Sequence, residues 1–186
     1  MLNLTRCLTL YASALILLLQ DQISYGAGST RRDSNEVYCL ELTGIIRALD
    51  DNCLNKATVN IYRDTTLFLS VKSRNTGKCS IKLPLNGKYT VVFSKPGYVS
   101  KKIVVNADIP FSRRQQYKLS FKIYLFEQVK GVDTSMFDAP VAFIIFKNAK
   151  NFDYDDSYTK VLNRKAEKIY KEYYSCLLYT SPSPRD

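Results

Sequence analysis

The sequence predicts a mainly β protein: an antiparallel β-sandwich of about seven to nine strands, followed by one C-terminal α-helix. Two observations predict this fold. Apolar and polar side chains alternate with a period of two along residues 42–105, as they do on half-buried strands. Turn-forming residues interrupt the alternation at short intervals, which is typical of a sandwich of short strands; they are Asp50–Asp51–Asn52, Asn75–Thr76–Gly77, Asn86–Gly87 and Pro96–Gly97.

The alternation assigns the strands in order. In the first strand, Leu40, Leu42 and Ile46 alternate with residues such as Glu41 and Thr43. The last predicted strand is a continuous apolar run, suited to a strand covered on both faces. The predicted strands cover residues 37–47, 58–62, 67–71, 80–83, 89–93, 100–105, 118–126 and 141–146.

Two turns carry specific conformational expectations. Asn86–Gly87 is the strongest hairpin signal in the chain, because both residues tolerate the positive φ of a type I′ turn. We therefore expect it to pair strand 80–83 with strand 89–93. Pro96–Gly97 fits the centre of a type II turn, with proline fixing φ and glycine taking the left-handed position.

An amphipathic helix follows the strands. Asp156 or Ser157 is expected to cap it, and it is expected to run to about Tyr174. Its predicted apolar face consists of Val161, Leu162, Ile169, Tyr170 and Tyr173. The chain thus divides into a sandwich with companion strands at residues 37–147 and an acidic turn with the helix at residues 148–175.

The N-terminal segment has the pattern of an export signal. A short head with one basic residue, Arg6, precedes an apolar run from Cys7 to Leu19, which is too short to span a bilayer as a helix. We expect residues 1–26 to be a signal peptide and residues 27–36 a flexible linker, although an uncleaved anchor or a buried helix remains an alternative. The expected location is exported: periplasmic, outer-membrane-associated or secreted, with no membrane span after cleavage.

The C-terminal residues 176–186, CLLYTSPSPRD, resemble the in-frame translation of a common transposon-type sequencing adaptor. A flexible tail rich in proline and serine is the alternative that this composition allows. We expect the segment to be an artefact, and we expect the natural protein to differ from this sequence beyond Ser175.

Charge and cysteine content narrow the class of protein. The net charge is +10, but the basic residues are scattered and form no stripe with interleaved aromatics, so we expect no nucleic-acid partner. Two alternatives stay open for the cysteines of the expected mature chain. Cys39 and Cys53 form a disulfide, or they and Cys79 are three small hydrophobic residues, with Cys79 the most buried.

Two candidate sites remain. Asp153, Asp155 and Asp156 form the densest acidic group, which would suit a hard cation such as calcium. The same carboxylates would equally cap the amides at a helix N-terminus. Tyr98, beside the Pro96–Gly97 turn, is the best candidate for an exposed aromatic platform that binds a sugar; the alternative is ordinary burial.

The sequence argues against catalysis and cofactor binding. It contains no histidine, so a Cys/His zinc site and a histidine general base are both excluded. No motif places a lysine beside a nucleophile. We therefore expect a non-enzyme without cofactors.

Several short motifs follow one another in a specific order: Gly44 followed by Asp50, Ala57–Thr58–Val59, Asn75–Thr76–Gly77–Lys78, Gly87–Lys88–Tyr89 and Lys95–Pro96–Gly97–Tyr98. This order resembles the carboxypeptidase regulatory-like domain. The resemblance implies a transthyretin-like (prealbumin-like) β-sandwich that serves as an accessory or binding module. Two positions depart from the pattern: Cys79 replaces an aromatic residue, and Asn52–Cys53 is unusual in the first loop.

The segments GVDTSMFDAPVA and FDYDDSYT also resemble uncharacterised exported proteins of Gram-negative bacteria. Together the resemblances imply a non-catalytic structural or protein-interaction module of the bacterial cell envelope, whose partner is an envelope protein or a polysaccharide. The alternative is a module that binds carbohydrate or an anionic surface, as the accessory part of a longer protein.

Overall fold

The computed structural model describes residues 38–180, with side chains described as far as residue 176. The predicted signal peptide (1–26), the predicted linker (27–36) and residues 181–186 of the predicted adaptor tail lie outside the described residues.

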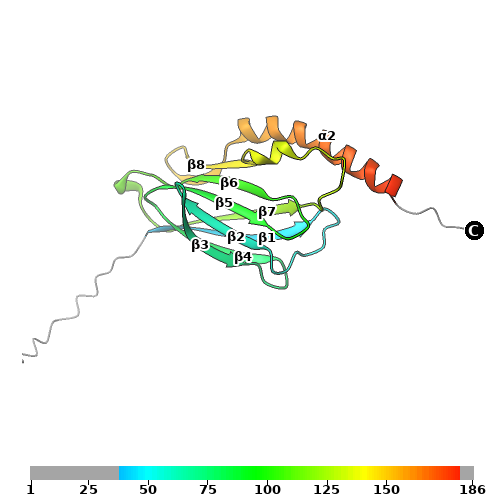
Figure 1. Ribbon diagram of the computed structural model, residues 1–186. Coiled ribbons are helices and arrows are strands. Elements are labelled where there is room, and N and C mark those ends of the chain that lie inside the picture. The colour runs from blue at the N-terminus through cyan, green and yellow to red at the C-terminus, as the bar shows by residue number, and fades with distance from the viewer. Residues whose placement is uncertain (1–37, 181–186) are drawn as a thin grey trace, which may run out of the picture. The chain divides into compact units, whose positions relative to one another are not determined.

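The described chain forms nine strands in two sheets and ends in helix α2 (Asp156–Thr180) (Figure 1). The three-stranded sheet has the order β4-β1-β7 and the six-stranded sheet the order β3-β2-β5-β6-β8-β9. This architecture confirms the predicted β-sandwich with a C-terminal helix. The strands are β1 (Cys39–Ala48), β2 (Thr58–Arg63), β3 (Thr66–Lys72), β4 (Lys78–Pro84), β5 (Lys88–Ser94), β6 (Lys101–Asn106), β7 (Tyr117–Leu125), β8 (Ala142–Lys147) and β9 (Asn151–Tyr154).

The sheets are mixed rather than antiparallel. Five of the seven strand pairs are antiparallel, whereas β1–β7 and β6–β8 are parallel. The expected antiparallel pairing is therefore correct for five pairs and wrong for β1–β7 and β6–β8. The period-two alternation reports which face of a strand is buried, and it is the same in both kinds of pairing.

The Asn86–Gly87 turn does not form the predicted hairpin. β4 pairs with β1, and β5 pairs with β2 and β6, so this turn carries the chain from one sheet to the other. Neither residue has a positive φ, which rules out a type I′ turn. The turn is instead held by the guanidinium of Arg63, which donates to the Asn86 carbonyl at 2.9 Å.

A turn of the type I′ kind occurs at Asn148–Ala149, between β8 and β9. The two residues have φ of 52° and 51°, and the Lys150 amide donates to the Lys147 carbonyl at 3.0 Å. The segment predicted as an acidic turn thus contains a strand, β9, which was not predicted from the sequence.

The turn at Pro96–Gly97 agrees with the predicted type II turn. Gly97 has φ of 81°, and the Tyr98 amide donates to the Lys95 carbonyl at 3.0 Å, as this turn type requires.

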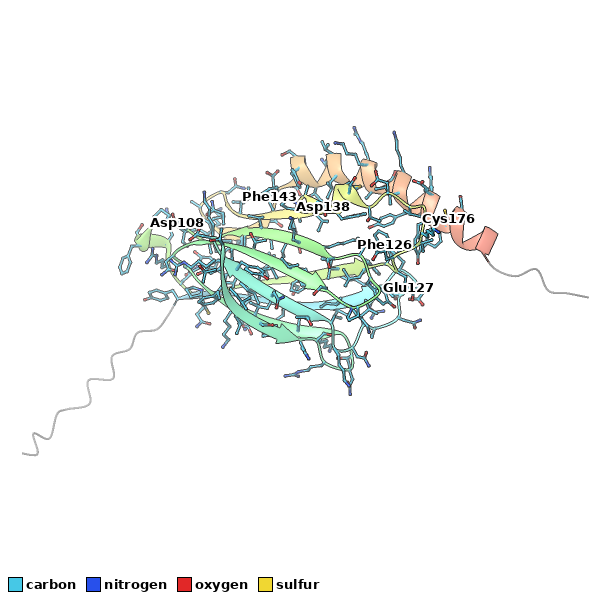
Figure 2. All side chains as sticks on the ribbon, viewed as in Figure 1. Asp108, Phe126, Glu127, Asp138, Phe143 and Cys176 are labelled. Carbon is cyan, nitrogen blue, oxygen red and sulfur yellow. The ribbon has the colours of Figure 1, made fainter. Side chains whose placement is uncertain are left out.

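The main core fills the space between the two sheets. Inward-facing residues of both sheets are fully buried there, including Leu40, Leu42, Ile61, Ile81, Leu83, Val91 and Phe93. A smaller apolar cluster lies beside it and consists of Val99, Phe126, Phe137, Ala166 and Tyr173. Phe126 follows β7 on the side of the sandwich that α2 covers (Figure 2).

Helix α2 uses only part of its predicted apolar face. Tyr173 is buried, and Leu162, Ile169 and Tyr170 are partly buried, but Val161 is 55% exposed. Near its start the helix is anchored by Tyr158, whose hydroxyl donates to the Pro140 carbonyl at 2.6 Å. The helix continues past the predicted end at Tyr174 to Thr180.

Gly44 of β1 fits against the ring of Phe121 on the neighbouring strand β7. A Cβ atom at Gly44 would lie 2.5 Å from the ring, which is far inside van der Waals contact. We predict that Gly44→Ala lowers the free energy of unfolding by about 1–3 kcal/mol, because the ring is forced out of a packed core. Urea unfolding of the purified protein measures the change. In a Phe121→Leu background the same substitution should cost much less, and an equal cost in both backgrounds would contradict this packing account.

Ala149 adopts the left-handed conformation without being glycine. This conformation costs an L-residue about 1–2 kcal/mol. We predict that Ala149→Gly raises the free energy of unfolding by about 0.5–1 kcal/mol, measured by the same urea titration. The matched control is Ala166→Gly inside α2, which should lower it by about 1 kcal/mol. A decrease with Ala149→Gly would show that the turn has another conformation.

Candidate functional site

The predicted acidic group forms the N-terminal cap of α2. The Asp155 Oδ1 atom accepts the amides of Ser157 at 3.1 Å and Tyr158 at 3.3 Å. The hydrogen bond from the Ser157 side chain, followed by the backbone bond from Tyr158, lowers the pKa of Asp155. The cap is therefore Asp155 rather than Asp156 or Ser157. The other two carboxylates face Lys147, whose Nζ lies 2.6 Å from Asp156 and 3.8 Å from Asp153.

This arrangement contains the contacts that the helix-capping alternative describes. Each of the three carboxylates has an internal partner: Asp155 accepts the helix amides, and Asp153 and Asp156 face Lys147. Within residues 38–180 no group of three or more acidic, cysteine or histidine side chains is arranged to hold a metal ion.

Tyr98 is partly buried rather than fully exposed. Its hydroxyl donates to Glu127 Oε1 at 3.3 Å, and its ring lines a cavity of about 260 Å³ with Tyr173 and Tyr174. Burial, and then the charge of Glu127, raises the pKa of Tyr98. The cavity thus combines aromatic rings with the acidic side chains of Asp50 and Glu127.

The Cys39–Cys53 disulfide is wrong for this fold. Both cysteines are free thiols, Cys39 buried and Cys53 exposed. Cys39 begins β1, whereas Cys53 pairs with Arg47, eight residues further along that strand. Eight residues span about 26 Å at the rise of an extended strand, and a disulfide needs Cα atoms within about 7 Å. The small-hydrophobe alternative describes Cys39 and Cys79, which are both buried.

A buried lysine, which was not among the candidate residues predicted from the sequence, lies between β6 and α2. Lys101 of β6 is 4% exposed, and its Nζ donates to the Tyr170 hydroxyl at 2.9 Å. The same Nζ lies 5.0–5.3 Å from the ring centres of Phe126, Phe137 and Tyr170. Among the described side chains, no carboxylate lies within 4.0 Å of it. Burial lowers the pKa of Lys101 to about 8.

Lys101 lines a cavity beneath α2 of about 290 Å³. The walls come from strands β5 to β9 and the 3-10 turn Ser135–Asp138 on one side and from α2 on the other; they include Phe93, Ile103, Ile123, Phe137, Leu162 and Ala166. A signal for this site existed in the sequence. Lys101 shares the phase of Ile103 and Val105 in a strand of period two, so the alternation placed it on the buried face.

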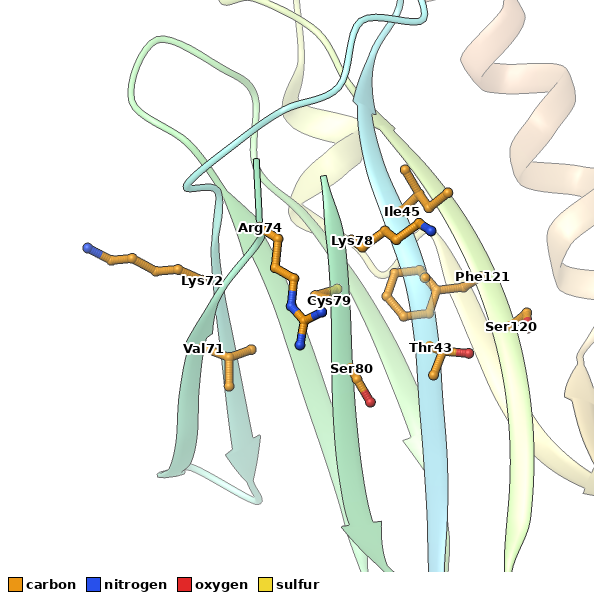
Figure 3. A pocket seen from close by; sticks show the side chains of 11 residues that line it. Thr43, Ile45, Val71, Lys72, Arg74, Lys78, Cys79, Ser80, Ser120 and Phe121 are labelled. Atoms are coloured by element: carbon orange, nitrogen blue, oxygen red, sulfur yellow. The ribbon is translucent and has the colours of Figure 1, made fainter. Parts of the chain in front are cut away.

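A second candidate site, separate from the cavity beneath α2, is the open edge of the sandwich between β3 and β4. A cavity of about 570 Å³ lies there, and Val71, Cys79 and Phe121 form part of its wall. Figure 3 shows Arg74 between the two edge strands, with Lys72 and Lys78 nearby. Nearer the start of β3, away from the residues that line the cavity, three consecutive residues are exposed: Leu67 (53%), Phe68 (44%) and Leu69 (37%).

No family model matches this chain, and no curated protein matches it in sequence. The resemblance to the carboxypeptidase regulatory-like domain therefore has no support from these comparisons. Within the described residues, no helix is both long and apolar enough to cross a bilayer.

Solved structures with a similar arrangement include the Bacillus anthracis TIE protein, with 20% identity, a TM-score of 0.40, and coverage of 48% of this chain and 17% of that one. Catechol 1,2-dioxygenase from Acinetobacter sp. ADP1 has 15% identity and a TM-score of 0.41, covering 61% and 59%. The pilus 2b backbone protein of group B streptococcus has 11% identity and a TM-score of 0.35, covering 48% and 42%. The chain spans less than two thirds of each, and likenesses at these scores carry no argument about function.

The buried ammonium predicts a specific pH dependence of stability. The pKa of Lys101 is about 8 when folded and 10.5 ordinarily, so between these values the unfolded chain binds more protons and stability rises with pH. Below pH 8 the full cost of the buried charge is present. Across this pH range the contribution of Lys101 to the free energy of unfolding changes by about 3 kcal/mol in total. We predict that Lys101→Met gains stability relative to the parent at pH 7 and that this relative gain shrinks by pH 9.5.

Urea unfolding of both proteins across this range measures the difference. The lost hydrogen bond to Tyr170 adds an offset that does not depend on pH below the range in which tyrosine ionises. The exposed Lys88, at the opposite end of the β5–β6 pair, is the control when changed to Met and should show no such trend. A constant difference between the parent and Lys101→Met would contradict the buried charge.

Proposed function

We propose that this chain is a non-catalytic protein-interaction module of the bacterial cell envelope that binds a partner by strand addition along β3. The observation that carries the proposal is the exposed apolar edge of β3. The remainder of the proposal, export and an envelope partner, rests on the signal-like pattern of residues 1–26 and on the family resemblance.

Strand β3 is an open edge. It is the terminal strand of the six-stranded sheet and pairs only with β2 among the described strands. One row of its backbone groups thus lacks a ladder partner. Globular proteins usually protect such an edge with proline, charge or a covering segment. β3 ends in Lys72 and its pairing with β2 contains a register shift, but it also carries Leu67, Phe68 and Leu69 in succession, all exposed.

An added strand would gain both backbone hydrogen bonds and apolar contact here. In strand addition the main chain supplies affinity, and pockets for alternate side chains supply specificity. The adjoining cavity offers such a pocket, with the cations of Lys72, Arg74 and Lys78 around it. This charge favours a partner segment that is extended, apolar in alternation and acidic at its end.

The absence of histidine in the sequence supports a non-catalytic role. The proposed fold family is the carboxypeptidase regulatory-like, transthyretin-like sandwich, whose members are accessory modules in most settings. Strand addition at the β3 edge requires binding of the partner but no catalytic step.

A second candidate function is carbohydrate binding. The observation that favours it is the cavity around Tyr98. Aromatic rings with carboxylates are a combination suited to sugars, and Tyr98, Tyr173, Asp50 and Glu127 provide it. The net charge of +10 also suits an anionic envelope surface. Saturable glycan binding that Tyr98→Ala abolishes would favour this function over strand addition. Failure of every envelope glycan at millimolar concentration would remove it.

We predict that the double variant Leu67→Lys and Leu69→Lys abolishes partner binding while leaving the fold intact. A photo-crosslinking amino acid at Phe68 in the full chain would identify the bound segment in an envelope extract. A synthetic peptide of that segment is then titrated by calorimetry. The variant should bind at least tenfold more weakly, because lysines on the edge oppose strand addition.

The matched control is Val161→Lys, which adds the same charge at a similarly exposed apolar position on α2. It should leave peptide affinity unchanged. Equal affinity of the β3 double variant and the parent would overturn the proposal, as would a crosslinked segment whose binding depends on α2 instead.

A further inference from the structure

The charge of Lys101 is incompletely satisfied by the protein itself. An ammonium has three donors, and one of them is used by Tyr170 at 2.9 Å. The aromatic rings around it supply favourable cation–π contact, but no described carboxylate lies within 4.0 Å. A buried charge without a counter-ion is unfavourable for folding, and an apolar side chain would fill the same space without that cost.

The cavity beside Lys101 suits an apolar molecule. Its volume of about 290 Å³ lies at the lower end of ligand pockets and equals the share of about ten waters in the liquid. Most of its wall is apolar and comes from both sheets and α2. The neutral polar groups on its lining are the side chains of Thr159, Asn163, Tyr154, Tyr170 and Tyr124.

The charged side chains that line the cavity indicate which sign of charge a ligand should carry. Lys101 and Lys122 line the cavity, and no acidic side chain does. Lys122 lies partly in solvent and already faces Asp51 at 3.4 Å. One buried cation therefore remains to be neutralised, which matches a ligand with one negative charge rather than two. A phosphate monoester would bring excess charge into this apolar space.

We propose that the cavity beneath α2 binds a small monocarboxylate with an apolar body, whose carboxylate pairs with the ammonium of Lys101. The apolar body lies against Phe93, Ile103 and Ile123, and α2 covers it. This site is separate from the β3 edge and does not depend on the function proposed for that edge.

Octanoate is the probe, because it has about the size that the cavity holds. Calorimetric titration of the full chain at pH 7 measures its affinity, with octan-1-ol and octylamine as neutral and cationic controls of the same length. We expect octanoate to bind and both controls to bind at least tenfold more weakly. Lys101→Met should weaken octanoate binding at least tenfold. The matched variant Lys102→Met, on the opposite face of β6, should not change it.

A second measurement needs no variant. In the unaltered protein, addition of octanoate should shift the side-chain NMR resonances of Lys101 more than those of any other lysine. The proposal is overturned if octanoate does not bind at 10 mM, if octan-1-ol binds equally well, if Lys101→Met retains the parent affinity, or if another lysine shows the largest shift.

Discussion

The fold depends on how two sheets of unequal width are covered. Six strands face three, so a single opposing sheet does not cover the whole inner surface at β6 and β8. Helix α2 and the 3-10 turn Ser135–Asp138 complete the cover, and their aromatic residues pack around Phe126. The edge-to-face ring contacts between Phe126 and Phe137, Tyr170 and Tyr173 have centroid separations of 5.2–5.7 Å. The position of the helix therefore also determines the cavity and the environment of Lys101.

As a result, one side of the sandwich is covered and the other side has an open edge. Near β7 and β9, Tyr117 packs against Phe146 and Phe152, and α2 continues the covering surface. At β3 and β4 no described segment covers the edge, and apolar residues and cations are accessible. One side thus encloses a space suited to a small molecule, and the other offers backbone and apolar surface to another chain. This asymmetry separates the two proposed binding events in space.

The sequence predicted the positions of eight of the nine strands and the helix because burial imposes a period on side chains wherever a sheet has an inner face. It did not predict which strands pair, since that depends on contacts between segments far apart in sequence. Asn86–Gly87 shows this limit: the local signal for a hairpin is strong, but β4 finds a better partner in β1. Asn148–Ala149 shows the reverse case, in which pairing of β8 with β9 imposes a left-handed conformation on an alanine.

The candidate site was predictable only in part. The capping alternative for the acidic group followed from local chemistry, and Asp155 performs that role one residue before the expected position. Lys101 was visible as a charge in the apolar phase of a strand, but its significance depends on Tyr170, which lies 69 residues away in sequence. Val161 is exposed because it precedes Leu162 by one residue, which places it about 100° around the helix from the inward-facing stripe that includes Leu162 and Ala166.

The central claim is that α2 is an integral layer of the sandwich and closes the space in which Lys101 lies. Native-state hydrogen exchange measures this most directly. The account predicts that amides in the middle turns of α2, near Ala166, exchange through the same cooperative opening as those of β5, with similar free energies. Protection near Ala166 that is weak while β5 remains fully protected would contradict it, because the helix would then detach without unfolding the sheets.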